Sequence, residues 1–190
     1  MILVIDTSAG LAAVATIDGE KWTEEFMPSR DPALIEYLRH TAQTSTITKV
    51  AVATGPGSFT GLRKGVSFGL GLAMGLRIPI VPLPTLELQA ARSAEPVTAI
   101  SEAGRGRFYY LVPGGHIGLG EPADIPTSHP LVGRRSPAAE VTFEEAGHRF
   151  KPESELQPFP EAAAQLLKTA REVPYDSLKL EYMQTFSARK

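Results

Sequence analysis

One helical segment with a glycine at every fourth residue limits what this chain can fold into more than any other feature. Residues 58–76 have the apolar spacing of a helix, yet they contain five glycines. Glycine inside a helix costs about 0.8–1 kcal/mol relative to alanine, so packing must offset roughly 4–5 kcal/mol. Gly61, Gly65, Gly69 and Ala73 fall four residues apart and form one narrow stripe that lets another backbone approach closely.

Two surfaces could pack against this stripe. The first is the chain's own sheet or its first helix, and the second is a helix of a partner protein. Apolar residues such as Leu62, Val66 and Leu70 flank the stripe on both sides. The spacing alone therefore favours neither surface.

The order of the apolar segments predicts an α/β fold with a mixed sheet. Asp18-Gly19 lies between two β-rich runs and is typical of a hairpin turn. Residues 113–137 are rich in Gly, Pro and Ser and are expected to form an irregular connection. The expected strands are 2–5, 11–17, 20–26, 49–54, 78–81, 97–100 and 107–112, and the expected helices are 31–43, 58–76, 85–93 and 161–172.

Composition excludes several classes of function. The 190 residues include no cysteine, which excludes disulfides, thiolate zinc sites, iron–sulfur clusters and cysteine nucleophiles. The net charge of −2 provides no overall cationic field for nucleic acid. The longest apolar stretch, residues 65–76, is shorter than the ~20 residues of a membrane span, and the first residues lack a basic signal region. We expect a soluble, cytoplasmic protein.

The glycine-rich turn at residues 55–58 resembles a phosphate-binding loop, because backbone amides at a helix start can hold an anion. A Walker loop requires Gly-Lys-Ser/Thr where this chain has Thr60-Gly61-Leu62. The dinucleotide fingerprint requires a glycine where Thr60 stands. Both patterns fail, which favours a plain strand-to-helix turn capped by Ser58.

A second possible phosphate turn follows the first expected strand. In nucleotide-binding sheets of this order, an acid at that place can hold magnesium and neighbouring hydroxyls can contact phosphate. The matching place in the second half is Ser101-Glu102-Ala103-Gly104, and no adenosine-recognition signature is evident. The isolated Asp-Thr-Ser motif favours a capped strand end over a phosphate turn. The vestigial phosphate-turn candidates are Asp6, Thr7, Ser8 and Glu102.

The sequence predicts no catalytic residue and no metal site. The four histidines are His40, His116, His129 and His148, and no two have the spacing of a helical metal pair. Ser101, Ser128 and Ser136 lack the context of a nucleophile elbow.

Four motifs follow one another along the first half of the chain. They are Asp6-Thr7-Ser8, the run Gly55-Pro56-Gly57-Ser58-Phe59-Thr60-Gly61-Leu62-Arg63, Gly75-Leu76 with Ile78-Pro79, and Thr85-Leu86-Glu87. In this order they resemble the motifs of the bacterial TsaB (YeaZ) family. The resemblance is strong over residues 1–95, moderate over 97–112 and thin beyond. There, Leu180-Glu181-Tyr182-Met183 resembles a degraded form of the family's closing Pro-x-Tyr-Leu-Arg.

The resemblance implies an actin-like ATPase or sugar-kinase-like (RNase H-type) α/β fold, with two lobes of mixed sheets flanked by helices. We expect an N-terminal lobe at residues 1–96, completed by about 177–190, and a smaller second lobe at 97–176. Two departures fall at functional places. Arg30-Asp31 replaces a His-Ser pair, and Glu102-Ala103-Gly104 replaces Asp-Ala-Arg, with Arg105 one place later.

The resemblance also implies a non-catalytic scaffold or activator subunit in the synthesis of N6-threonylcarbamoyladenosine, at the adenosine 3′ of the tRNA anticodon. Its expected partners are TsaD, which carries the transfer chemistry, and the ATPase TsaE. Alone it is expected to be a homodimer without a cofactor, contacting tRNA only through the complex and no membrane. Whether a nucleotide binds at the interface with TsaD stays open.

The family's dimer surface is formed by the first two helices, here residues 31–43 and 58–76, which favours a partner helix against the glycine stripe. The expected interface residues are Leu34, Leu38, Phe59, Leu62, Gly61, Gly65, Gly69 and Ala73. The alternative functions are a small ATP-dependent kinase of the actin-like superfamily and a glycoprotease-like peptidase. The missing phosphate turns argue against the kinase, and the missing histidine pair argues against the peptidase.

Overall fold

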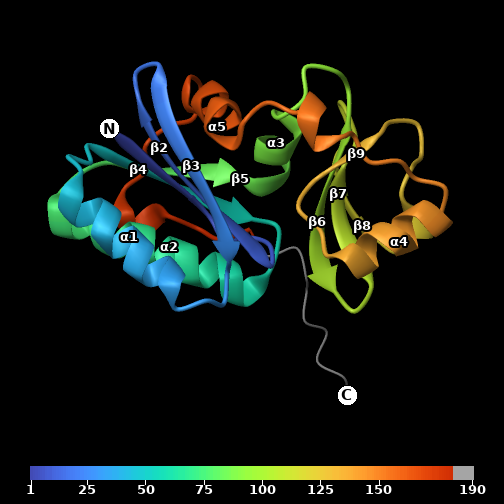
Figure 1. Ribbon diagram of the computed structural model, residues 1–190, viewed down its shortest axis with the longest axis horizontal. Coiled ribbons are helices and arrows are strands. Elements are labelled where there is room, and N and C mark those ends of the chain that lie inside the picture. Colours follow the sequence, from blue (N-terminus) through green and yellow to red (C-terminus); the bar gives the residue numbers. More distant parts are fainter. Residues whose placement is uncertain (182–190) are drawn as a thin grey trace.

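Two mixed β-sheets, each with its own helices, build the protein (Figure 1). The computed structural model describes residues 1–181. The first sheet has the strand order β3-β2-β1-β4-β5, in which β1 pairs antiparallel with β2 and parallel with β4. Its strands are β1 (Ile2–Asp6), β2 (Leu11–Asp18), β3 (Lys21–Pro28), β4 (Lys49–Gly55) and β5 (Ile80–Pro84).

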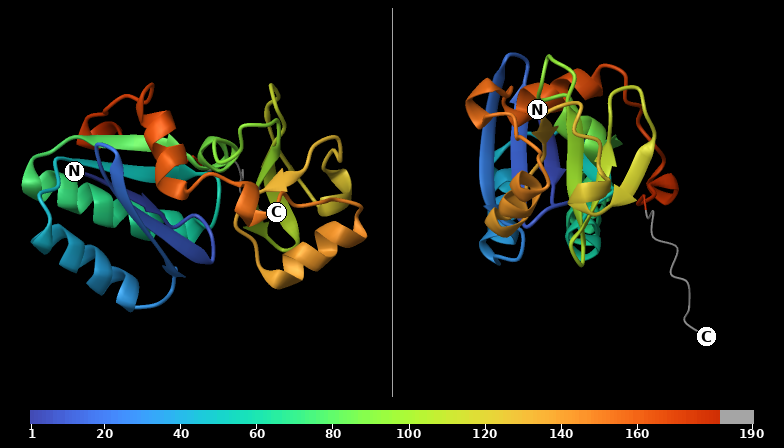
Figure 2. Two further views of the ribbon diagram at one scale, coloured as in Figure 1. Left: turned by 45° about the horizontal axis from the view of Figure 1, so that its top comes forward. Right: turned by 90° about the vertical axis from the view of Figure 1, so that its right-hand side faces the viewer.

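Helices cover both faces of the first sheet, as the two views of Figure 2 show. On one face lie α1 (Ala33–Thr44) and α2 (Phe59–Leu76), and on the other lie α3 (Thr85–Ala90) and α5 (Phe159–Leu167). Alternate residues of β1 point to opposite faces, so Leu3 packs with α1 and α2 while Val4 packs with α5. This burial on both faces explains why the central strands are continuously apolar.

The second sheet is smaller and has the order β8-β7-β6-β9. Its core includes Phe143 of α4, which packs edge-on against Phe108 with ring centroids 4.6 Å apart. The elements are β6 (Thr98–Gly104), β7 (Arg107–Leu111), β8 (Ile117–Gly120), β9 (Leu131–Val132) and α4 (Pro137–Glu145). Single 3-10 turns lie at Pro122–Asp124, Glu153–Glu155 and Tyr175–Ser177.

Most predicted elements are confirmed, although several bounds differ. The helix predicted at 85–93 ends at Ala90, and the strand predicted at 97–100 extends to Gly104. The strand predicted at 78–81 is β5 at Ile80–Pro84, because the Ile78 amide still donates to Ala73 at the end of α2. The helix predicted at 161–172 begins at Phe159 and ends at Leu167.

The irregular connection predicted for residues 113–137 is wrong, since it contains β8 and β9. Helix α4 was not predicted at all. The local sequences of β8 and β9 are rich in turn formers. Long-range pairing of β8 with β7 and of β9 with β6 decides their conformation.

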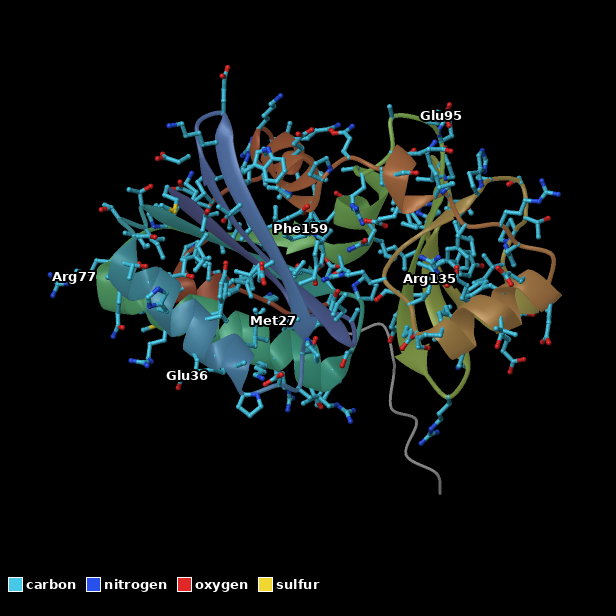
Figure 3. The ribbon with its side chains drawn as sticks, viewed as in Figure 1. Met27, Glu36, Arg77, Glu95, Arg135 and Phe159 are labelled. Carbon is cyan, nitrogen blue, oxygen red and sulfur yellow. The ribbon has the colours of Figure 1, made fainter. Side chains whose placement is uncertain are left out.

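The chain returns to the first sheet within the range predicted for the second lobe. Phe159 at the start of α5 lies in the core of the first sheet (Figure 3). The Glu181 amide donates to the carbonyl of Thr54 over 2.9 Å, beside the end of β4. Residues 182–190, with Tyr182 and Met183 of the predicted closing motif, lie outside the described residues. The division near residue 96 stays a prediction.

Candidate functional site

The glycine stripe of α2 packs on the chain's own first sheet. A Cβ atom added at Gly61 would overlap the carbonyl oxygen of Thr7, and one at Gly65 would overlap the Thr7 hydroxyl. A Cβ atom at Gly69 would overlap the Val52 side chain. The Thr7 hydroxyl donates to the carbonyl of Gly61 over 2.7 Å, which holds the helix against the end of β1.

This packing corrects the predicted partner interface residue by residue. Phe59 is the one predicted interface residue that is exposed, at 43%. The others are buried in the chain's own core, because the first sheet occupies that side of α1 and α2. The buried residues are Leu34, Leu38, Gly61, Leu62, Gly65, Gly69 and Ala73.

The opposite side of the helix pair faces outward and carries apolar side chains. Ile35 of α1 is 36% exposed and Met74 of α2 is 53% exposed. Cβ atoms at Gly71 and Gly75 would meet nothing within 4 Å, so the backbone of α2 is accessible there. We call this surface the outer α1–α2 face, formed by Ile35, Phe59, Arg63, Ser67, Gly71, Met74 and Gly75.

A cavity of about 650 Å³ lies between the two lobes. Leu11 and Phe26 line it from the first sheet, and Glu102 and Arg135 line it from the second lobe. Figure 3 shows Arg135 in the second lobe. The cavity size falls in the range of small-molecule sites.

At the inner end of this cleft, Asp6 is fully buried and surrounded by donors. Its Oδ1 accepts from the Ser8 amide over 2.9 Å, and its Oδ2 accepts from Gln89 and from Nη2 of Arg134. Nη1 of Arg134 donates to the carbonyl of Leu11 over 3.0 Å. Burial lowers the pKa of the Arg134 guanidinium, and the Asp6 charge opposes that shift.

The other two arginines of the cleft are also paired with acids. Arg92 forms an ion pair with Glu153, and its Nε donates to the carbonyl of Gln157 over 3.1 Å. Arg135 pairs with Glu140 over 2.6 Å. These pairs leave the cleft without an excess of positive charge for an anion.

The other predicted phosphate-turn atoms have partners within the protein. Oε1 of Glu102 accepts from the Ser136 amide over 3.0 Å at the start of α4. The Ser58 amide donates to the carbonyl of Ser8 over 2.7 Å, and the Ser58 side chain accepts from Gly61 as the predicted cap. Glu102 thus lines the cleft, whereas Asp6 and Ser8 are buried and bonded to Arg134, which also lines it. The polar groups of all three residues are engaged within the protein.

Sequence reasoning missed Arg134, Arg92 and Gln89. The only signal in the sequence was the pair Arg134-Arg135 within a turn-rich stretch. Among residues 1–181, no three His, Asp or Glu side chains gather as a metal site. Within the same part of the chain, no helix is long and apolar enough to cross a membrane.

The strand order of the first sheet, the helices on both its faces and the cleft between two lobes define an actin-like (RNase H-type) α/β protein. The fold comparison agrees. The structure of YeaZ from Pseudomonas aeruginosa superimposes with a TM-score of 0.68 at 17% identity, covering 96% of this chain and 99% of that one. A second solved structure, described as an uncharacterized protein with similarity to peptidase YEAZ from the same organism, gives 0.69 at 20% identity with the same coverage.

The sequence comparisons identify the family. The model of TsaD, tRNA N6-adenosine threonylcarbamoyltransferase, matches residues 20–128, more than half of the chain. A tRNA threonylcarbamoyladenosine biosynthesis protein TsaB from Haemophilus influenzae is 30% identical over 122 residues, covering 57% of this chain and 52% of that protein. TsaB from Bacillus subtilis is 41% identical over 66 residues, covering 33% of this chain and 29% of that protein.

The chain belongs to the TsaB (YeaZ) family, and the predicted resemblance and fold class are confirmed. TsaB from Escherichia coli, at 30% identity over 127 residues, covers 57% of this chain and 53% of its own length. The chain therefore spans about half the length of the curated relatives it matches.

Proposed function

We propose that this chain is a non-catalytic subunit that pairs with TsaD in the synthesis of tRNA threonylcarbamoyladenosine. The names of its relatives support the pathway. The observation that carries the non-catalytic role is the cleft. Its one fully buried carboxylate, Asp6, is neutralised by the chain's own Arg134. A carboxylate that is held in this way is not free to bind metal or to transfer a proton.

The same observation weighs against a small kinase. Phosphoryl transfer relies on positioned cations and donors around the phosphates. Here the Ser58 amide is bonded to Ser8, and Glu102 is bonded to the start of α4. The groups that would receive a nucleotide already bond to one another, so we favour the scaffold over the kinase.

We propose that TsaD docks on the outer α1–α2 face. Ile35, Phe59 and Met74 supply exposed apolar contacts there. The open glycines Gly71 and Gly75 would let a partner helix approach closely. By the same argument, two copies of the chain would pair through this face when TsaD is absent, and TsaE would join the pair with TsaD.

Reconstitution tests the proposed role. We expect no modified tRNA when this chain is incubated alone with threonylcarbamoyl-adenylate and tRNA, and restored synthesis when TsaD and TsaE are added. The measurement is mass spectrometry of tRNA nucleosides, with TsaD and TsaE without this chain as the control. Modified tRNA formed by this chain alone would contradict the proposal.

A further inference from the structure

Arg134 and Asp6 are an unusual pair because both are buried and they come from different lobes. Asp6 ends β1, the central strand of the first sheet. Arg134 stands between β9 and α4 in the second lobe. The side chain of Arg134 is only 10% exposed, and that of Asp6 is fully buried. The pair therefore joins the two lobes at the inner end of their cleft.

We infer that the guanidinium of Arg134 is the permanent counter-ion of the Asp6 carboxylate and excludes a divalent metal ion from it. The same contact acts as a latch that holds the second lobe against the first. This inference deepens the Asp6–Arg134 pairing on which the proposed non-catalytic role rests, and it does not depend on the docking of TsaD.

The donor set around Asp6 does not fit a magnesium ion. Mg²⁺ takes oxygen ligands in a near-ideal octahedron and usually keeps several waters, so its site needs room for them. Asp6 has no exposed surface. Its Oδ1 already receives the Ser8 amide, and its Oδ2 receives both Gln89 and Arg134. A metal would have to displace a guanidinium that already balances the carboxylate charge.

Arg134 donates several hydrogen bonds to the first lobe, and together they hold the two lobes to each other. Nη1 donates to the carbonyl oxygens of Asp6 and Leu11, over 3.3 and 3.0 Å, and Nη2 donates to the Asp6 carboxylate. The planar guanidinium can thus bond to a strand end and to the start of the next strand at once. Removing one partner of such a pair leaves a buried charge unpaired, which is strongly destabilising.

A double-mutant cycle tests the pairing. The variants are Asp6→Asn, Arg134→Met and the double variant, and the measurement is the melting temperature of the full chain. We expect each single change to lower it by roughly 10 °C, because each leaves a buried charge or an unmet donor. We expect the double variant to recover most of that loss. Losses that simply add in the double variant would overturn the inference.

Metal exclusion is tested on the unaltered chain, so it does not depend on any variant folding. Calorimetric titration with Mn²⁺, and melting in millimolar Mn²⁺, should show neither binding nor stabilisation. Arg134→Ala keeps the Asp6 carboxylate and removes the side chain that reaches it from the cleft, so this variant should melt higher with Mn²⁺ than without it. Adding Asp6→Asn to Arg134→Ala should abolish that gain. Mn²⁺ binding by the unaltered chain that Asp6→Asn abolishes would overturn the inference.

The latch is tested by hydrogen–deuterium exchange of residues 6–11, with Arg135→Met as the matched control. Arg135 pairs with Glu140 inside the second lobe, so its loss should leave exchange at residues 6–11 unchanged. Arg134→Met, or the double variant if the single one does not fold, should speed that exchange at least tenfold. Equal exchange in the Arg134 and Arg135 variants would overturn the latch.

Discussion

Thr7 shows how one buried side chain can set the position of a whole helix. It is 2% exposed at the end of β1, and its hydroxyl donates to the carbonyl of Gly61. Gly65 lies against the same hydroxyl one turn later. Because α2 approaches the end of β1 this closely, packing on the first sheet requires glycine at positions 61 and 65. That contact offsets the helix propensity that glycine lacks.

Two matched alanine substitutions test this contact. Gly65→Ala should lower the free energy of unfolding by about 1–3 kcal/mol, because the new methyl group overlaps Thr7 and outweighs the gain in helix propensity. Gly71→Ala, on the open side, should raise it by up to about 1 kcal/mol. Urea unfolding measures both. Equal effects of the two changes would contradict the packing described here.

Glu181 gives a pH-dependent prediction. Partial desolvation of its carboxyl raises its pKa, and the charge of Glu87 raises it further. The folded state therefore holds this proton more tightly than the unfolded state, and the resulting stability is present at low pH and lost as pH rises through the raised pKa. Glu181→Gln should raise the melting temperature more at pH 7 than at pH 4. An equal gain in melting temperature at both pH values would contradict this prediction.

At the scale of elements, α2 presents two different faces. The inner face packs glycines against β1 and β4, and the outer face combines exposed apolar residues with open backbone at Gly71 and Gly75. The two sets of glycines fall on opposite sides of the helix, and only the second set is accessible to a partner. We therefore expect the partner surface on the side of α2 that carries Gly71 and Gly75, away from the predicted glycine stripe.

Gly71→Leu tests the outer α1–α2 face. The side chain points into open space, so the folded chain should melt no lower than the original. Bulk at a close helix crossing should weaken association with TsaD by about 1–3 kcal/mol. Co-elution with TsaD in gel filtration measures it, and Thr44→Leu, at the end of α1, is the control. A Gly71→Leu chain that co-elutes normally would place the partner surface elsewhere.

At the scale of the whole molecule, charge and the cleft both favour a role through partners. The net charge is −2, and the arginines of the cleft are paired with acids. The longest consecutive basic runs are pairs such as Arg63-Lys64. Neither feature provides a cationic surface that could neutralise many phosphates.

We therefore expect weak binding of tRNA by this chain alone. The dissociation constant should lie in the non-specific range, roughly 10⁻⁴–10⁻⁶ M, and should rise steeply with salt. Fluorescence anisotropy of labelled tRNA at two salt concentrations measures it, with the complex containing TsaD as the comparison. Sub-micromolar binding that resists salt would contradict this expectation.

The sequence by itself determined the order of the central elements, the Ser58 cap of α2 and the family. Each of these features depends on a local pattern in the sequence. Buried strands are continuously apolar, a serine stands directly before the helix, and the glycine run has a specific order. The sequence also indicated that α2 has a close neighbour, because five glycines in one helix need compensation.

Only the tertiary structure decided which neighbour that is and how the cleft is filled. Both flanks of the glycine stripe are apolar, so the pattern could not tell the sheet from a partner, whereas the contacts of Gly61 and Gly65 with Thr7 do. Asp6 and Arg134 are 128 residues apart, and their pairing depends on how the second lobe lies against the first. A local pattern carries no information on such a contact, because it arises only when both lobes are folded.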